Sequence, residues 1–105
     1  MSEYFAVATA DELKPAQMKR VLLDGKRLLL CNSAGTLYCV DEMCSHEDYS
    51  LYLGCIKDGK IKCSLHGSYF DLTSGIPTCE PADTAIRTYP LKIEAGQVWV
   101  KPEAK

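Results

Sequence analysis

The sequence predicts an all-β fold, an antiparallel sandwich or partly open barrel, and three observations favour that class. Turn-forming pairs such as Asp24-Gly25 and Asp58-Gly59 recur at short intervals along the chain. The segments between the turns are short and rich in β-branched, aliphatic and aromatic residues, which favour strands. No long helical periodicity alternates with these segments, so a parallel α/β sheet is not expected.

Seven segments are predicted as strands, and several of them follow one another at the spacing of β-hairpins. In chain order these strands cover residues 20–23, 27–31, 36–40, 60–63, 68–72, 91–94 and 97–101. A chain of 105 residues has room for one hydrophobic core, and no linker or repeat divides it. Residues 1–105 are therefore predicted to form a single domain.

The one helical candidate lies near the N-terminus. Thr9 stands three residues before Glu12, which is the spacing of a capping box at the start of a helix. A short turn of helix is therefore predicted through Leu13, and Pro15 should end it.

Composition and charge argue against several classes of protein. Apolar residues make up 47% of the chain and charged residues 25%, as in a soluble globular domain. The net charge is −2 and no basic block occurs, so nucleic acid is not an expected partner. Glu3 stands where a secretory signal would be basic, and no apolar run reaches the roughly 18 residues of a membrane span. We expect a cytoplasmic protein without a membrane partner.

The six cysteines are many for this length, and in a reducing compartment they indicate metal binding rather than disulfides. The two longest non-periodic stretches, residues 42–56 and 66–87, are the predicted functional loops. Cys44-Ser45-His46 lies in the first stretch, and Cys63-Ser64-Leu65-His66 leads into the second. Between the motifs lie residues 47–62, which is 62 − 46 = 16 residues, and the motifs hold both histidines of the chain.

Each motif can bring one thiolate and one imidazole to a shared site if its loop curls, whereas a regular strand would send alternate side chains to opposite faces. Two sulfur and two nitrogen ligands suit one tetrahedral zinc ion, or two irons bridged by sulfide. The order Cys, His, Cys, His on loops differs from that of ordinary zinc fingers, in which the histidines lie on a helix. The residues alone leave zinc and iron both open.

The two motifs resemble the cluster-binding loops of Rieske iron-sulfur proteins, C-x-H followed by C-x-x-H. The chain length, the turn Thr73-Ser74-Gly75 and the later Tyr89-Pro90-Leu91 make the chain similar to the free Rieske-type ferredoxins of bacterial aromatic ring-hydroxylating dioxygenase systems. The resemblance implies a Rieske-like antiparallel fold with a small cluster-binding subdomain, whose loops cover about 42–56 and 63–81. It also implies one Rieske-type [2Fe-2S] cluster.

Carried over by position, the resemblance implies that Cys44 and Cys63 hold one iron and that His46 and His66 hold the other. Neutral imidazoles in place of two thiolates make the second iron easier to reduce. They raise the potential to roughly −150 to +300 mV, against about −400 mV for plant-type ferredoxins. Three further residues are implied to surround the cluster with backbone donors, a hydroxyl and a covering loop: Gly67, Ser68 and Pro81.

The loops depart from the respiratory branch of the family. Tyr49 and Leu65 stand where that branch has an extra cysteine in each loop, so no loop disulfide is expected. Phe70 stands where that branch has a tyrosine that donates to a cluster sulfur, so we expect a potential in the lower part of the Rieske range. With Leu51 and Tyr52, the residues Tyr49 and Leu65 also form a predicted apolar rim for transient docking.

The chain is predicted to be an electron carrier and not an enzyme by itself, because both histidines are used and no dinucleotide fingerprint occurs. The resemblance implies a flavin-containing, NAD(P)H-dependent ferredoxin reductase as electron donor and the terminal ring-hydroxylating oxygenase as acceptor, with a monomeric carrier between them. Two alternatives stay open. One is a small subunit fixed in a complex such as assimilatory nitrite reductase, and the other is a zinc-binding interaction module.

The remaining cysteines and the acids of the first loop are expected to have no part in the site. Four cysteines are expected in or near the core: Cys31, Cys39, Cys55 and Cys79. Three acids are expected to form a solvated face: Glu42, Glu47 and Asp48.

Overall fold

The computed structural model describes residues 3–44, 50–63, 69–78 and 84–104. Within these ranges it contains ten strands, in three antiparallel sheets, and one turn of 3-10 helix, η1. The elements are β1 Phe5–Thr9, β2 Met18–Leu23, β3 Lys26–Ser33, β4 Thr36–Asp41, η1 Leu51–Leu53, β5 Cys55–Lys57, β6 Lys60–Lys62, β7 Tyr69–Asp71, β8 Thr88–Tyr89, β9 Leu91–Glu94 and β10 Gln97–Val100. Among the described residues no helix could cross a membrane.

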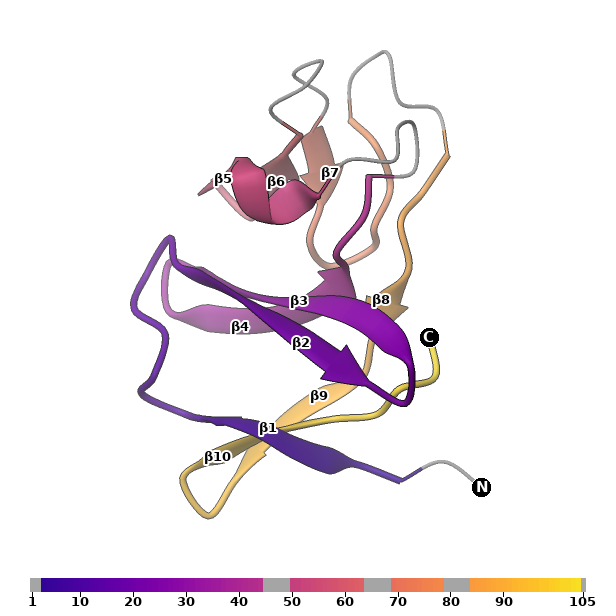
Figure 1. Cartoon of the computed structure of the whole chain (residues 1–105). Coiled ribbons are helices and arrows are strands. Elements are labelled where there is room, and N and C mark those ends of the chain that lie inside the picture. The colour runs from indigo at the N-terminus through magenta and orange to yellow at the C-terminus, as the bar shows by residue number, and fades with distance from the viewer. Residues whose placement is uncertain (1–2, 45–49, 64–68, 79–83, 105) are drawn as a thin grey trace.

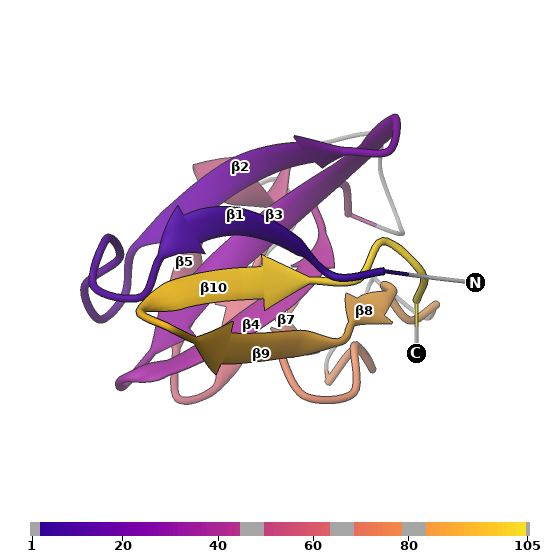
Figure 2. The ribbon, with the colours of Figure 1, turned by 90° about the horizontal axis from the view of Figure 1, so that it is seen from below.

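The three sheets lie one above another (Figure 1). The order β2-β3-β4-β8 makes the middle sheet, β1-β10-β9 makes the lower sheet, and β5-β6-β7 makes a small upper sheet. Seen from below, the lower sheet covers one face of the middle sheet (Figure 2). This arrangement confirms the predicted antiparallel sandwich with a small additional subdomain, and no described sheet closes into a barrel.

Four of the strand pairs are hairpins closed by two residues with positive φ, the backbone that suits the twist of neighbouring strands. The prediction of hairpins from turn signals is therefore confirmed for three of the four, whereas at Asp58-Gly59 the turn was predicted but the strand before it, β5, was not. The pairs are Asp24-Gly25, Ala34-Gly35, Asp58-Gly59 and Ala95-Gly96.

Strand β3 separates two hydrophobic cores. Leu28 and Leu30 pack in the lower core with Val98 and Val100, between the middle and lower sheets. The alternate residues Leu29 and Cys31 pack in the upper core, beneath the small sheet. Side chains along a strand point to opposite faces, and a strand buried on both faces reads as a continuous apolar run. This explains the uninterrupted segment 28–31.

The predicted helix does not form, and this prediction was wrong. Thr9 ends β1, and residues 10–12 make a turn. The capping-box hydrogen bond itself is present, since the Thr9 N–H donates to Glu12 Oε1 at 3.2 Å and the Glu12 N–H donates to the Thr9 carbonyl at 3.2 Å. Pairing of β1 with β10 fixes Thr9 as extended backbone, so the same contact closes a turn instead of a helix.

Some strands and burial states also differ from the predictions. No strand was predicted at β1, β5 or β8, whose partners β10, β6 and β4 are needed to stabilise them. Cys31 and Cys39 are buried as predicted, whereas Cys55 is exposed at the start of β5. Glu42 was expected in a solvated face but is buried. Residues 47, 48 and 79 lie outside the described ranges.

Candidate metal centre

The first predicted loop starts and ends on backbone that is tied together. Met43 and Ser50 form an isolated antiparallel bridge across the loop. Beside it the Leu51 N–H donates to the Glu42 carbonyl at 2.6 Å. The side chain of Ser50 then accepts from the Tyr52 N–H and caps η1. Cys44 therefore follows a segment whose position is fixed on both sides of the loop.

A buried carboxylate reinforces this loop base. Glu42 is only 3% exposed, and its Oε2 accepts a hydrogen bond of 2.6 Å from the Ser50 hydroxyl. The Arg27 guanidinium supplies the opposite charge, with Nε 3.4 Å from Glu42 Oε1. A buried charge is tolerated when it is paired and hydrogen-bonded. Glu42 thus links the end of β4 to Ser50, on the far side of the loop, and to Arg27 in β3.

The second predicted loop lies within a β-hairpin. Strand β6 ends at Lys62, Cys63 follows it, and β7 begins at Tyr69. Lys62 and Tyr69 are paired in the antiparallel register, and so are Ile61 and Phe70 one step further from the loop. The hairpin therefore holds Cys63 at the end of a paired strand.

Hydrogen bonds connect Thr78 and Arg87, which lie on either side of the segment 79–83, to the bases of both loops. On one side the Thr78 N–H donates to the Tyr69 carbonyl at 2.8 Å, next to the second loop. On the other side Asp41 and Arg87 exchange two bonds of 3.0 Å, from the Asp41 N–H to the Arg87 carbonyl and from the Arg87 N–H to Asp41 Oδ2. Because Asp41 comes three residues before Cys44, the bases of the two predicted loops and the described residues around 79–83 belong to one connected scaffold.

The two predicted cysteine ligands are brought into one buried cluster. Cys44 is 6% exposed and Cys63 is 1% exposed. They share the upper core with Leu51, Phe70 and Ile86. The apolar surroundings restrict water on the inner side of the site, which is one way in which a protein controls the potential of a metal cluster.

The other predicted site residues lie outside the described ranges, and their roles stay predictions: His46, His66, Gly67, Ser68 and Pro81. The donor set of the described part fits the cluster that the resemblance implies. Cys44 and Cys63 are cysteines from two different loops, held at one end of the molecule in the same core. A thiolate pair of this kind suits iron or zinc.

Two glycines that were not predicted as site residues allow the scaffold to close. A Cβ at Gly54 would lie 1.7 Å from the carbonyl oxygen of Lys62, the residue before Cys63. A Cβ at Gly75, where φ is +78°, would lie 2.1 Å from the carbonyl oxygen of Ile86. Gly75 stood in a predicted turn, but no sequence signal marked Gly54, because its neighbour is eight positions away in the chain.

The cysteines of the middle sheet are unsuited to metal binding because they stay protonated. Burial, followed by the charge of Asp41, raises the pKa of Cys39 to about 12. Burial, followed by Cys39, raises the pKa of Cys31. Metal ligation requires the thiolate, so these two residues act as core side chains.

The predicted apolar rim is present in part. Tyr52 is 39% exposed and lies under the Arg20 guanidinium, whose carbon is 4.6 Å from the ring centre. Leu53, which was not predicted, is 59% exposed in the same turn η1. Leu51 is fully buried and does not belong to the rim. Residues 49 and 65 lie outside the described ranges.

The chain matches known proteins over most of its length. Residues 3–90 match the family model of the Rieske [2Fe-2S] domain. The ferredoxin component of the naphthalene 1,2-dioxygenase system of Pseudomonas putida is 35% identical over 95 residues, which is 90% of each chain.

Solved structures agree with this match. The ferredoxin of carbazole 1,9a-dioxygenase from Nocardioides aromaticivorans IC177 superposes with a TM-score of 0.90 at 28% identity, over 95% of this chain and 98% of its own. A chain from a complex of reduced oxygenase and oxidized ferredoxin in carbazole 1,9a-dioxygenase superposes with a TM-score of 0.92 at 25% sequence identity. The match covers 97% of this chain and 95% of the other. A nitrite reductase small subunit, at 21% identity and a TM-score of 0.81 over 93% of this chain and 97% of its own, shares the fold.

The paired cysteines, the sheet order and these matches agree on one family. The chain belongs to the Rieske [2Fe-2S] domain family and is an electron-transfer ferredoxin of that family with one Rieske-type cluster.

Proposed function

We propose that this ferredoxin carries single electrons from a flavin-containing, NAD(P)H-dependent ferredoxin reductase to the terminal oxygenase of an aromatic ring-hydroxylating dioxygenase system. The observation that carries this proposal is the pair of buried cysteines at the bases of two connected loops. Relatives named as dioxygenase ferredoxin components, and a ferredoxin relative solved in complex with its oxygenase, support the identity of the acceptor.

In this proposal Cys44 and Cys63 bind one iron of the cluster, and His46 and His66 bind the other. The bound cluster supplies reversible one-electron chemistry. The chain holds both cysteines against an apolar core, so that water is restricted on the inner side. Gly67, Ser68 and Pro81 are proposed to complete the surroundings of the cluster.

Spectroscopy and metal analysis of the anaerobically purified protein test the cluster. We expect two irons and two acid-labile sulfides per chain, visible absorption that bleaches with dithionite, and a Rieske-type EPR signal in the reduced state. A colourless protein that holds one zinc would overturn the proposal.

Single substitutions test the ligands. Cys44→Ser, Cys63→Ser, His46→Cys and His66→Cys should each alter or abolish the absorption and EPR signals, because each changes a donor atom. The matched control is Cys55→Ser, which changes an exposed cysteine outside the upper core. If both histidine variants kept the wild-type spectrum, the ligand assignment would be wrong.

Electron transfer tests the partners. A ferredoxin reductase with NADH should reduce the wild-type protein anaerobically, and adding a ring-hydroxylating oxygenase should reoxidise it. We expect the protein to purify without bound partner chains. Stable co-purification with a nitrite reductase large subunit would instead favour a fixed subunit, the alternative that shares the fold.

A further inference from the structure

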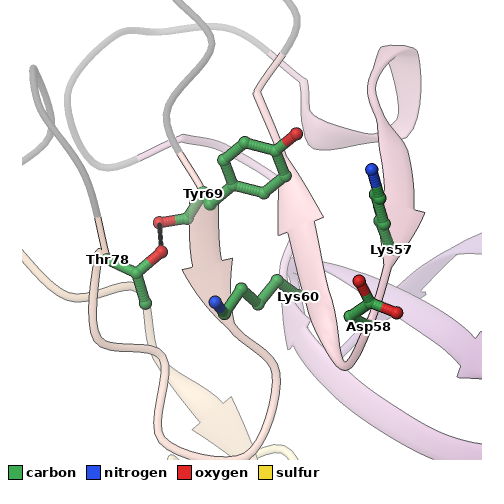
Figure 3. Close-up of a pocket in the computed structure, with 5 residues that line it drawn as sticks. All are labelled: Lys57, Asp58, Lys60, Tyr69 and Thr78. Atoms are coloured by element: carbon green, nitrogen blue, oxygen red, sulfur yellow. Dashed lines mark hydrogen bonds between the residues drawn. The ribbon is translucent and has the colours of Figure 1, made fainter.

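An open groove with two lysines lies beside the second cluster loop. Its volume is about 370 Å³, and it is lined by Lys57, Asp58, Lys60, Tyr69 and Thr78. In Figure 3 Lys57 and Asp58 stand on one side of the groove, Tyr69 and Thr78 on the other, and Lys60 extends between them. The hairpin β5-β6 therefore presents cations toward the strand β7 that leaves the second loop.

These lysines are not neutralised within the described part of the chain. Neither the Lys57 nor the Lys60 ammonium group forms an ion pair or a hydrogen bond with a described residue, in contrast to Lys19, whose Nζ lies 2.7 Å from Glu12. Asp71 is paired with Lys60 in the register, but its Oδ1 accepts the N–H groups of Thr73 and Ser74 at 2.8 and 3.1 Å.

The charge of the groove is opposite to that of the whole molecule. The chain carries a net charge of −2, whereas the described residues that line the groove contribute two ammonium groups and one carboxylate, that of Asp58. Lys62 adds a third cation at its margin, with Nζ 5.9 Å from the centre of the Tyr69 ring. A local positive patch on an acidic protein orients it toward a negative surface before contact.

The groove is continuous with the proposed electron-transfer end. Tyr69 is the first residue of β7 after the second loop, and Thr78 is bonded to its carbonyl. Lys62 directly precedes Cys63. A partner group held in the groove would therefore lie beside the paired strand ends from which the second loop starts, next to Cys63.

We infer that this groove receives carboxylate side chains from the surface of the terminal oxygenase that accepts the electron. The inference rests on the proposed function and specifies the recognition chemistry of its acceptor. Lys57 and Lys60 provide the charge, and the hydroxyl of Tyr69 is available as a hydrogen-bond donor to the same carboxylates. Weak contacts of this kind suit a carrier that must dock and release repeatedly.

The first test measures the local charge with small oxidants. The reduced cluster passes one electron to ferricyanide, which becomes ferrocyanide, or to the cationic tris(phenanthroline)cobalt(III), which becomes cobalt(II). In Lys57→Gln/Lys60→Gln we expect oxidation by ferricyanide to be slower by about threefold or more at low salt, and oxidation by the cobalt complex to be faster. Unchanged rates with both oxidants would overturn the inference.

A matched control is Lys92→Gln/Lys101→Gln, which changes the net charge equally. Lys92 and Lys101 lie near Tyr4, with Nζ 4.6 and 5.7 Å from its ring centre, by the lower sheet and away from the small upper sheet. This control should leave both rates near the wild-type values. Lys57→Arg/Lys60→Arg should restore the rate with ferricyanide because the positive charge returns.

The second test uses the protein acceptor. The rate of electron transfer to the oxygenase should fall in Lys57→Gln/Lys60→Gln, and its dependence on ionic strength should become shallower than in the Lys92→Gln/Lys101→Gln control. A loss confined to transfer from the reductase would overturn the assignment to the oxygenase. If the proposed function itself fails, the EPR signal or the oxygenase turnover is absent in the wild type too, which distinguishes the two failures.

Discussion

The two halves of the molecule, divided by β3, are stabilised in different ways. The lower half is a sandwich of strands of four to eight residues together with the two-residue strand β8, and aliphatic side chains fill most of its core. The upper half has strands of three residues, and bonds between loops, a buried carboxylate and two glycines hold it in shape. Packing therefore stabilises the fold below β3, whereas specific backbone contacts shape the metal site above it.

A cavity in the lower core should have the largest effect on global stability. Leu30→Ala removes a side chain that is 1% exposed, in the middle of that core. We expect a loss of about 3 kcal/mol in the free energy of unfolding, from lost burial and the cavity left behind. Chemical denaturation measures this loss, and the EPR signal of the folded fraction should stay that of the wild type. A changed signal would show that the two halves are not distinct in function.

A methyl group at Gly75 should instead damage the site. Gly75→Ala brings a Cβ to 2.1 Å from the Ile86 carbonyl oxygen, so the backbone near Ile86 must shift. We expect this shift to lower the free energy of unfolding by about 2 kcal/mol. Iron content and EPR line shape should change. Gly96→Ala is the control, because φ there is +74° and no atom lies within 4 Å of its Cβ. Equal effects of the two variants would refute the role of the close approach.

Removing the charge of Glu42 should loosen the first loop. Glu42→Gln weakens the hydrogen bond from the Ser50 hydroxyl and removes the charge that pairs with Arg27. We expect the free energy of unfolding to fall by about 1 to 2 kcal/mol. We expect faster loss of iron to a chelator and a shifted reduction potential. Glu12→Gln changes an exposed acid paired with Lys19 and should leave both unchanged. Wild-type iron retention in the Glu42 variant would contradict the role of this carboxylate.

The smallest effect concerns alkaline pH. Burial and then the hydrogen bond to Asp41 raise the pKa of Tyr89, and burial raises the pKa of Cys39 from 9.0 to about 12. The folded state therefore favours the protonated forms, and their contribution is complete below pH 9 and lost as the pH rises toward 12. At pH 10 the loss from Cys39 is about 1 kcal/mol. Thermal unfolding between pH 8 and 11 measures it.

Variants again provide the contrast. Cys39→Ala and Tyr89→Phe should each make the melting temperature fall less steeply with pH than in the wild type. Cys55→Ala should keep the wild-type slope, because Cys55 is exposed. A wild-type melting temperature that stayed constant from pH 9 to 11 would contradict the linkage.

The sequence predicted features that depend on neighbouring residues in the chain. The hairpins follow from pairs such as Asp24-Gly25, whose positive φ values close two-residue turns. The two cysteines proposed as ligands were singled out by motif spacing, and the structure places both in one core. The chemistry of the ligands and the turns is local, so it can be deduced without coordinates.

Other features could not be predicted because distant residues create them. Strand β1 is stabilised by its pairing with β10, in which Phe5 lies opposite Val100. Glu42 is buried only because Arg27 and Ser50 surround its carboxylate. Gly54 is needed because the Lys62 carbonyl lies against it. Periodicity and spacing contain no information on such contacts.

The burial of β3 on both faces has a consequence for how the sequence can change. Each of the residues 28–31 is at most 1% exposed, and successive residues serve opposite cores. A substitution that adjusts the surroundings of the metal site from this strand therefore moves backbone that the lower sandwich also depends on. Variation that adapts the carrier to new partners should accumulate in the outer hairpins, while β3 stays apolar and its amide protons exchange last with solvent.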